Sequence, residues 1–242
     1  MLRSSQNLPE RVRSLRERMA AAAATAGRNV DSVTFLAVSK SQPAQRIRAA
    51  AAAGLTDIGE SYLAEALGKM EELADLPLTW HFIGRLQANK TRQVAERFAW
   101  VHGIDRLKIA ERLAAQRPFH APPLNVCIQV NLAGEATKGG ASGPEVADLA
   151  AAVAALPRLT LRGLMCIPPA ETDPARQREW FARLRVLRDA LNQGGLTLDT
   201  LSMGMSDDFE AAILEGATIV RIGTALFGPR PSAAATGTIP PS

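Results

Sequence analysis

Hydrophobic residues recur along this chain in two alternating patterns. One is a short, nearly continuous apolar run, and the other places an apolar residue at every third or fourth position of a longer, more polar stretch. The short runs predict buried β-strands, whereas the three-to-four spacing predicts amphipathic helices. The predicted strands cover residues 33–38, 57–59, 80–84, 100–104, 124–132, 161–167, 198–203 and 218–222.

Helical segments separate these strands, and one further helix precedes the first strand. That leading helix has Pro9 near its start and Gly27 at its end, the positions at which these residues commonly mark helix boundaries. Its apolar side chains follow a 4-3-4 spacing and are Leu8, Val12, Leu15 and Met19. A second long amphipathic helix, between the sixth and seventh strands, carries Trp180, Leu184, Leu187 and Leu191.

Regular alternation of strands and helices indicates a parallel sheet with right-handed crossovers. Eight such units fit a closed (β/α)8 TIM barrel, whose usual size is about 250 residues. The alternative is an open, doubly wound sheet, but no Gly-x-Gly-x-x-Gly turn follows the first strand. We therefore expect residues 1–230 to form one barrel with an extra N-terminal helix. Residues 231–242, rich in Pro, Ala, Ser and Thr, are expected to form a disordered tail.

Composition narrows the possible functions. A net charge of +4, without a run of five basic residues, gives no support for nucleic-acid binding. The two cysteines, Cys127 and Cys166, lie in apolar runs and are expected to be core residues in a reducing compartment. No Cys/His cluster has metal-binding spacing. The N-terminus is too polar for a signal peptide and no apolar stretch could span a bilayer, so we expect a cytoplasmic protein.

Two small-residue turns follow the last two predicted strands. The first is Gly204-Met205-Ser206 and the second is Gly223-Thr224-Ala225, so each turn offers a glycine and a hydroxyl. Turns of this kind present N–H groups and hydroxyls to an anion. In a (β/α)8 barrel the loops after strands seven and eight are the usual phosphate site. Ser206 could instead cap the next helix, with Asp207 and Glu210 at capping-box spacing.

Three charged or polar residues near strand ends are further candidates. Lys40 ends the first strand on the side of the two turns, and a lysine among apolar neighbours suits Schiff-base formation with an aldehyde; alternatively it is a solvated loop residue. Arg221, inside the last strand, could donate to a ring nitrogen of a cofactor or be a buried residue held by a carboxylate such as Glu60. His81 is interpreted as a hydrogen-bonded core residue.

At these residues the chain closely resembles the pyridoxal phosphate homeostasis proteins, the family known as YggS in bacteria and PROSC in animals. The resemblance runs from about Val33 to Gly228 and is specific because several blocks occur together in the right order. The blocks are LAVSK, GESYLAE, WHFIGRLQANK, RGLMCIP, LSMGMSDD and VRIGTALFG.

This resemblance implies an alanine-racemase-like barrel that binds pyridoxal 5'-phosphate (PLP) as an internal aldimine to Lys40. It implies phosphate contacts from Ser206, Gly223 and Thr224 and places Arg221 against the pyridine nitrogen. Two further cofactor-binding residues are implied. They are Ser61 and Met203.

The chain departs from the family at two positions in the GESYLAE block. Ser61 stands where the family usually has Asn, which puts a side-chain contact to the cofactor in doubt, and Ala64 often has Gln in its place.

The expected function is non-enzymatic binding of PLP in intracellular PLP homeostasis. An arginine opposite the ring nitrogen would leave PLP a weak electron sink, and we expect no second domain that could supply a racemase's second base. The alternatives are a small PLP-dependent amino-acid racemase, with Tyr62 as the first candidate base, and an interaction scaffold. We expect PLP-dependent apo-enzymes as possible partners, no membrane or nucleic-acid partner, and a monomer.

Overall fold

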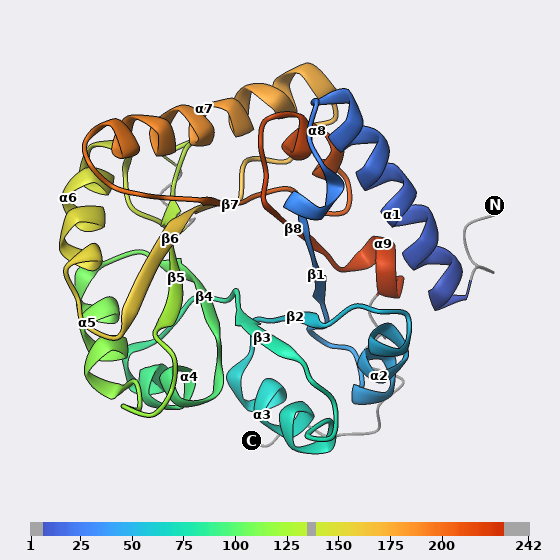
Figure 1. Ribbon diagram of the computed structural model, residues 1–242, viewed down its shortest axis with the longest axis horizontal. Helices are drawn as coiled ribbons and strands as arrows, with labels where there is room; N and C mark the ends of the chain where they lie inside the picture. Colours follow the sequence, from blue (N-terminus) through green and yellow to red (C-terminus); the bar gives the residue numbers. More distant parts are fainter. Residues whose placement is uncertain (1–6, 135–138, 230–242) are drawn as a thin grey trace, which may run out of the picture.

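The structure is a computed structural model that describes residues 7–134 and 139–229. In it, parallel strands close into a barrel in which each strand pairs with the next and β8 pairs with β1 (Figure 1). The predicted (β/α)8 TIM barrel is confirmed. The strands are β1 (Thr34–Val38), β2 (Asp57–Glu60), β3 (Thr79–Phe82), β4 (Trp100–Ile104), β5 (Leu124–Val130), β6 (Leu159–Cys166), β7 (Thr200–Ser202) and β8 (Ile219–Ile222).

Helices form an outer ring around this barrel, and α1 packs beside α8 and α9 (Figure 1). The predicted tail, residues 231–242, lies outside the described residues. The α-helices are α1 (Leu8–Thr25), α2 (Ala44–Ala52), α3 (Leu63–Glu72), α4 (Thr91–Arg97), α5 (Leu107–Gln116), α6 (Gly143–Ala154), α7 (Pro174–Gln193), α8 (Phe209–Leu214) and α9 (Thr224–Phe227), and the 3-10 turns are η1 (Val30–Ser32) and η2 (Ala88–Lys90).

The extra N-terminal helix begins at a complete capping box. The Asn7 side chain accepts a hydrogen bond from the Glu10 N–H at 3.1 Å, and the Glu10 carboxylate accepts one from the Asn7 N–H at 3.3 Å. Pro9 lies in the first turn, where its missing N–H is not needed. Beyond the helix end, Gly27 adopts the left-handed conformation with φ 65°. The sequence signals at both ends of this helix are therefore confirmed.

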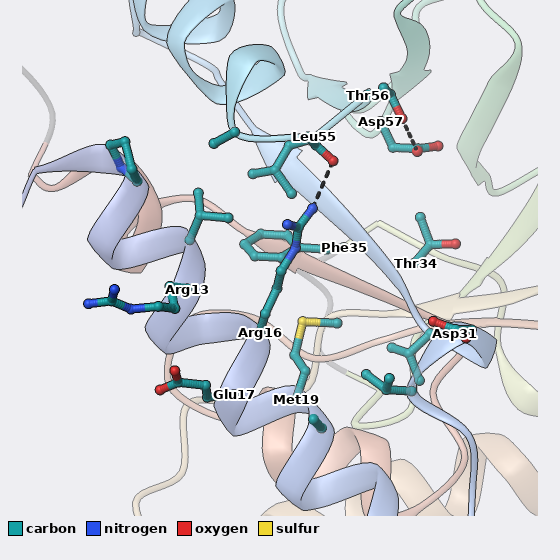
Figure 2. Close-up of a pocket in the computed structure, with 17 residues that line it drawn as sticks. Arg13, Arg16, Glu17, Met19, Asp31, Thr34, Phe35, Leu55, Thr56 and Asp57 are labelled. Carbon is teal, nitrogen blue, oxygen red and sulfur yellow. Dashed lines mark hydrogen bonds between the residues drawn. The ribbon is translucent and has the colours of Figure 1, made fainter.

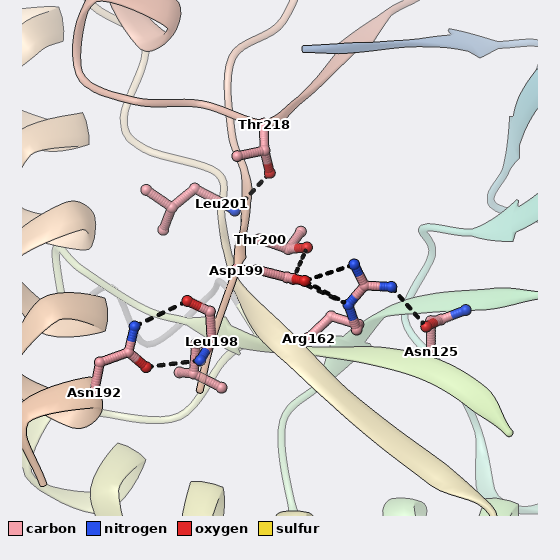
Figure 3. A network of polar contacts seen from close by, with 8 residues as sticks. All are labelled: Asn125, Arg162, Asn192, Leu198, Asp199, Thr200, Leu201 and Thr218. Atoms are coloured by element: carbon pink, nitrogen blue, oxygen red, sulfur yellow. Dashed lines mark hydrogen bonds and ion pairs between the residues drawn. The ribbon is translucent and has the colours of Figure 1, made fainter. Parts of the chain in front are cut away.

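The seventh strand is shorter than the predicted range 198–203. The side chain of Asn192, on α7, accepts from the Leu198 N–H at 2.7 Å and donates to the Leu198 carbonyl at 2.9 Å (Figure 3). Both backbone groups of Leu198 are thus held by a helix side chain and not by a neighbouring strand. Ladder pairing begins only at Thr200.

Side chains of β1 and β8 alternate between two layers. Phe35 and Ala37 of β1 point outward into the large hydrophobic core between barrel and helices, whereas Leu36 points into the barrel. On β8 the same alternation sends Val220 and Ile222 outward and Arg221 inward. The barrel interior therefore contains polar groups that the surrounding helices cannot reach.

Arg162 and its polar partners Asp199 and Asn125 lie at the end of the barrel where the strands begin. Arg162 donates to both oxygens of Asp199 at 2.7 to 3.1 Å and to the Asn125 side chain at 3.1 Å (Figure 3). Its guanidinium also lies 5.1 Å from the ring centre of Trp100, in cation–π geometry. Ligands of (β/α)8 barrels bind at the opposite end, at the C-terminal ends of the strands, which we call the open end.

Candidate functional site

The predicted site residues gather at that open end. They belong to β7, β8, β1 and β2 or to the turns after them, and these four strands are consecutive neighbours in the closed barrel. Leu36 pairs with Arg221 and Ala37 with Ile222, which places the end of β1 beside the turn after β8. The residues in question are Lys40, Ser61, Met203, Ser206, Arg221, Gly223 and Thr224.

The two glycine–hydroxyl turns are joined directly by a hydrogen bond. The Ala225 N–H, in the turn after β8, donates to the Ser206 hydroxyl oxygen at 3.1 Å. Gly204 has φ 91°, and a Cβ there would lie 2.5 Å from the Cβ of Ala212, so only glycine fits. Across the rim, a Cβ on Gly223 would lie 3.3 Å from the Val38 carbonyl oxygen. The two turns and the end of β1 thus form one tightly packed surface.

Ser206 is not the cap of the following helix, so that alternative reading is wrong. The N-cap of α8 is Asp208, whose carboxylate accepts from the Met205 N–H at 2.5 Å. Burial raises the pKa of Asp208, and this N–H offsets part of the rise. Ser206 lies two residues before this N-cap, and the Asp208 side chain itself makes no hydrogen bond to a helix N–H. The Ser206 hydroxyl is left to face the turn after β8.

Lys40 lies in a turn that is held from below by α3. We call Ser39, Lys40 and Ser41 the lysine turn. Lys69 donates to the Ser39 carbonyl at 2.7 Å, and Glu65 accepts from the Ser41 N–H at 2.6 Å. Ser41 has φ 61°, a left-handed conformation that costs a non-glycine residue roughly 1–2 kcal/mol. The surrounding hydrogen bonds offset this strain and fix the backbone on both sides of Lys40.

A buried ion pair lies beneath the lysine turn. The Lys69 ammonium is 2.7 Å from Glu60 and 2.5 Å from Glu65, and Glu60 is fully buried. Burial raises the pKa of Glu60, while Lys69 and the Ser39 hydroxyl, which donates to the same oxygen at 2.5 Å, oppose the rise. Glu60 therefore pairs with Lys69. The expectation that it holds Arg221 is wrong, because Glu60 faces α3 and Arg221 faces the barrel interior.

Arg221 is held instead by neutral oxygens. One terminal nitrogen donates to the Ser202 carbonyl at 2.6 Å and to the Ser202 hydroxyl at 2.9 Å, and the other donates to the Cys166 carbonyl at 2.8 Å. Burial lowers the pKa of Arg221, yet a guanidinium stays charged in proteins. The interior thus holds a fixed positive charge just below the open end.

A polar chain continues from Ser202 across the barrel interior. The Ser202 hydroxyl is 2.7 Å from His102 Nδ1, His102 Nε2 is 3.0 Å from His81 Nδ1, and His81 Nε2 is 3.0 Å from the Asp57 carboxylate. The expectation that His81 is a hydrogen-bonded core residue is confirmed. His102 and Ser202 were not identified from the sequence, where both occur singly in apolar strands.

Because this polar chain contains two buried histidines, we predict that the free energy of unfolding falls in mild acid. Burial lowers the pKa of His81, which Asp57 only partly offsets, and puts the pKa of His102 well below its ordinary value, with His81 and Arg221 adding to the effect. Below about pH 6.5 the unfolded chain therefore gains protons that the folded chain excludes, and each histidine removes up to about 1.4 kcal/mol per pH unit until its folded pKa is reached.

Urea unfolding at several pH values between 7.5 and 5.5 measures this loss. Glu60 and Asp208, whose pKa values burial raises, act in the opposite direction, so the decisive quantity is the difference between the wild type and His102→Gln. The variant should show a shallower loss, and His120→Gln, at an exposed position, should match the wild type. Equal slopes in wild type and His102→Gln would contradict the prediction.

Ser61, Met203 and Tyr62 differ in how they meet the open end. Ser61 is half-buried just after β2. Met203 is fully buried and belongs to the core outside the barrel, so only its main chain can line the rim. Tyr62 is 57% exposed at the start of α3, which leaves its side chain accessible to solvent.

The described residues show no second kind of site. No group of His, Cys, Asp and Glu within residues 7–134 and 139–229 could hold a metal ion. Cys127 and Cys166 are buried, and burial raises the pKa of each thiol to about 12, as expected for inert core cysteines. None of the helices in these ranges is both long and apolar enough to cross a membrane.

The fold and the arrangement of the site place the chain in a class of cofactor-binding barrels. Residues 11–231 match the family described as alanine racemase, N-terminal domain. The Pyridoxal phosphate homeostasis protein of Pseudomonas aeruginosa is 60% identical over 223 residues, covering 92% of this chain and 96% of the relative. The protein of the same name from Escherichia coli K12 is 51% identical over 219 residues, covering 89% of this chain and 94% of that protein.

A solved structure is similar along nearly the whole chain. PipY of Synechococcus elongatus with PLP bound superposes with a TM-score of 0.81 at 37% identity, and the match covers 92% of this chain and 100% of PipY. The chain belongs to the pyridoxal phosphate homeostasis protein family. The resemblance inferred from the sequence blocks is thereby confirmed.

Proposed function

We propose that this protein binds PLP at the open end of the barrel and serves PLP homeostasis as a carrier or buffer. One observation supports this most strongly. Lys40 and the two joined turns occupy the same rim, so an aldehyde and a phosphate of one small ligand can be held together. The relatives named for PLP homeostasis and the PLP-bound structure of PipY support the same ligand.

The turns fit a phosphate chemically. The Ser206 oxygen already accepts from the Ala225 N–H, so its hydrogen remains available to a phosphate oxygen. A Cβ at Gly223 would lie 3.3 Å from the Val38 carbonyl oxygen, a tight contact, and glycine lets the main-chain N–H groups approach the ligand closely. Gly223 and Thr224 would thus contribute N–H groups, and Thr224 and Ser206 hydroxyls.

Lys40 and Arg221 fit the two ends of the cofactor ring. The Lys40 amine would condense with the aldehyde to form a Schiff base, releasing one water, and the Ser39–Ser41 hydrogen bonds would hold the amine in position. Arg221, a permanent cation and donor, would face a ring nitrogen that carries no proton. PLP supplies an electron sink when its ring nitrogen is protonated, and Arg221 opposes that protonation.

A reversible covalent bond at an open rim suits release of PLP to PLP-dependent apo-enzymes. We extend the proposal to a cytoplasmic monomer that performs no efficient catalysis. Of the residues implied to contact PLP, we propose that Ser61 and Met203 contribute less to its binding than the others. Ser61 is shorter than the family's Asn, and Met203 presents only its main chain.

The first prediction under this proposal concerns the phosphate. Charged hydrogen bonds are worth roughly 1.5–3 kcal/mol each. We therefore expect Ser206→Ala to weaken PLP binding by about 10- to 100-fold, while the melting temperature without PLP changes little. Titration with PLP, followed by absorbance, measures the PLP affinity of the Ser206→Ala variant and of the wild type. Ser202→Ala is unsuitable as a control because Ser202 contacts Arg221, so Ser32→Ala, an exposed residue of η1, serves. Equal affinities for Ser206→Ala and wild type would remove Ser206 from the site.

The second prediction concerns racemisation. It needs a base on each face of the bound amino acid, and loss of one base typically lowers a rate about 10²–10⁴-fold. We expect incubation with L-alanine, followed by chiral chromatography, to show no turnover above that of free PLP. Sustained turnover that is lost in Lys40→Ala would contradict the carrier proposal and support the racemase alternative. Tyr62→Phe would then test whether that tyrosine is the second base.

A further inference from the structure

The polar chain across the barrel, from Asp57 to Arg221, has one direction when both of its imidazoles are neutral. A guanidinium can only donate hydrogen bonds and a carboxylate can only accept them. His81 must therefore carry a hydrogen on Nε2 and donate it to Asp57, which leaves Nδ1 of the neutral ring as an acceptor. That Nδ1 accepts from His102 Nε2–H, so the Nδ1 of a neutral His102 accepts in turn from the Ser202 hydroxyl, whose lone pair accepts from Arg221.

Burial lowers the pKa of both histidines and so favours the neutral rings, and the direction assigns the same tautomer to each. The two rings are also fixed in space, because Trp100 stacks on His81 with centres 5.5 Å apart and planes within 5°. Arg162 in turn holds Trp100 from the strand-start end of the barrel. Each link joins a different strand, so the chain connects β8 to β2 through the interior and not through the surrounding helices.

We propose that Asp57, His81 and His102 are positioning residues for Arg221. They turn the Ser202 hydroxyl so that its lone pair, and not its hydrogen, faces the guanidinium. With one terminal nitrogen held by Ser202 and the other by Cys166, Arg221 keeps a fixed plane and directs its remaining donors toward the open end. This role rests on the proposed function, in which those donors meet the PLP ring nitrogen.

The acceptor end of the chain is accessible to substitution. Asp57 lies in the wall of a cavity of about 800 Å³ between α1, η1 and the start of β1, and its side chain is 30% exposed (Figure 2). Asp31, exposed on the same wall, belongs to η1 and takes no part in the chain. Asp57 can thus be changed without opening a hole in the core, and Asp31 offers a matched control.

The first experiment reads the tautomers in the protein without PLP. Long-range ¹H–¹⁵N spectra of ¹⁵N-histidine protein should show two neutral imidazoles with the hydrogen on Nε2, beside the exposed His120 as reference. In Asp57→Ala the His81 ring loses its acceptor, and its signals should move toward the other tautomer or an exchanging mixture. A charged ring at pH 7.5, or an Nδ1–H tautomer at either position in the wild type, overturns the proposal.

The second experiment reads the effect on Arg221 through the cofactor. A net hydrogen bond is worth enough to change affinity by about 2- to 10-fold, so Asp57→Ala should weaken PLP binding by that factor and shift the absorption band of bound PLP. Asp57→Asn, which keeps a side-chain oxygen as acceptor, should restore most of the affinity, and Asp31→Ala should match the wild type. Equal losses in Asp57→Ala and Asp31→Ala, or no rescue by asparagine, contradict a positioning role. A wild type that binds no PLP would instead refute the proposed function, and the tautomers would still test the chain.

Discussion

Replacing Lys40 by arginine should remove covalent PLP binding while leaving the barrel folded. Arginine keeps the positive charge at the rim but has no amine that can condense with an aldehyde. The phosphate turns, Gly204–Ser206 and Gly223–Ala225, are unchanged, so weak binding should persist. We expect retention of PLP to fall about 100-fold or more, the range by which a second tethered attachment strengthens binding.

Absorbance spectra and gel filtration after incubation with PLP measure both parts of this effect. Lys90→Arg, a lysine of η2 that follows β3 at the same end of the barrel, is the matched control and should behave as the wild type. A visible absorption band in Lys40→Arg equal to that of the wild type would show that another amine carries the cofactor.

The second large effect should follow from Lys69→Met. The substitution keeps the length of the side chain but leaves the fully buried Glu60 without its cation. Breaking a buried ion pair on one side typically lowers the free energy of unfolding by about 3–5 kcal/mol. The Ser39 carbonyl also loses its donor, so PLP retention at Lys40 should decline in the same variant. Urea unfolding and PLP titration provide the two measurements.

Two further variants isolate the buried charge. Arg48→Met breaks an ion pair with Asp75 that is largely exposed, and it should reduce stability far less. Adding Glu60→Gln to Lys69→Met removes the uncompensated carboxylate and should restore part of the loss. If Lys69→Met and Arg48→Met destabilise equally, the pair beneath the lysine turn does not support the fold as described.

Local patterns were sufficient to predict the barrel. The alternation of apolar runs with helical spacing, Pro9 and Gly27 at the ends of the first helix, and the glycines after the last strands are all short-range signals. Strand ends were less certain because contacts outside the strand decide them. The range 198–203 shortens to Thr200–Ser202 since Asn192, on the preceding helix, takes both backbone groups of Leu198.

The location of candidate site residues could be predicted from the sequence only for residues that directly follow a strand. Lys40, Ser206 and Thr224 lie at one rim because parallel strands of a barrel end together, and their contact with a ligand stays a prediction. The partner of Glu60 was not predictable, because its contact with Lys69 depends on how α3 lies against β2 and the lysine turn. Glu65 and Lys69 do stand four residues apart, a spacing that suggests a helical ion pair but not its contact with the lysine turn.

The polar chain across the barrel interior could not be predicted from sequence patterns either. His102 and Ser202 are 100 residues apart and meet only because the barrel closes. His102 belongs to none of the sequence blocks, and Ser202, although it lies in the LSMGMSDD block, reads as an isolated polar residue in a strand. Contacts across a closed barrel depend on strand order, register and inward-facing position together.

The most direct test of the central claim is to identify the amine that holds PLP. Wild-type protein incubated with PLP is reduced with borohydride, digested, and examined by mass spectrometry for a pyridoxyl-modified lysine. We predict that the modification lies on the peptide containing Lys40, in stoichiometric amount. Modification mainly at Lys90 or Lys138, or no stable modification at all, would contradict the assignment of Lys40 as the residue that holds PLP.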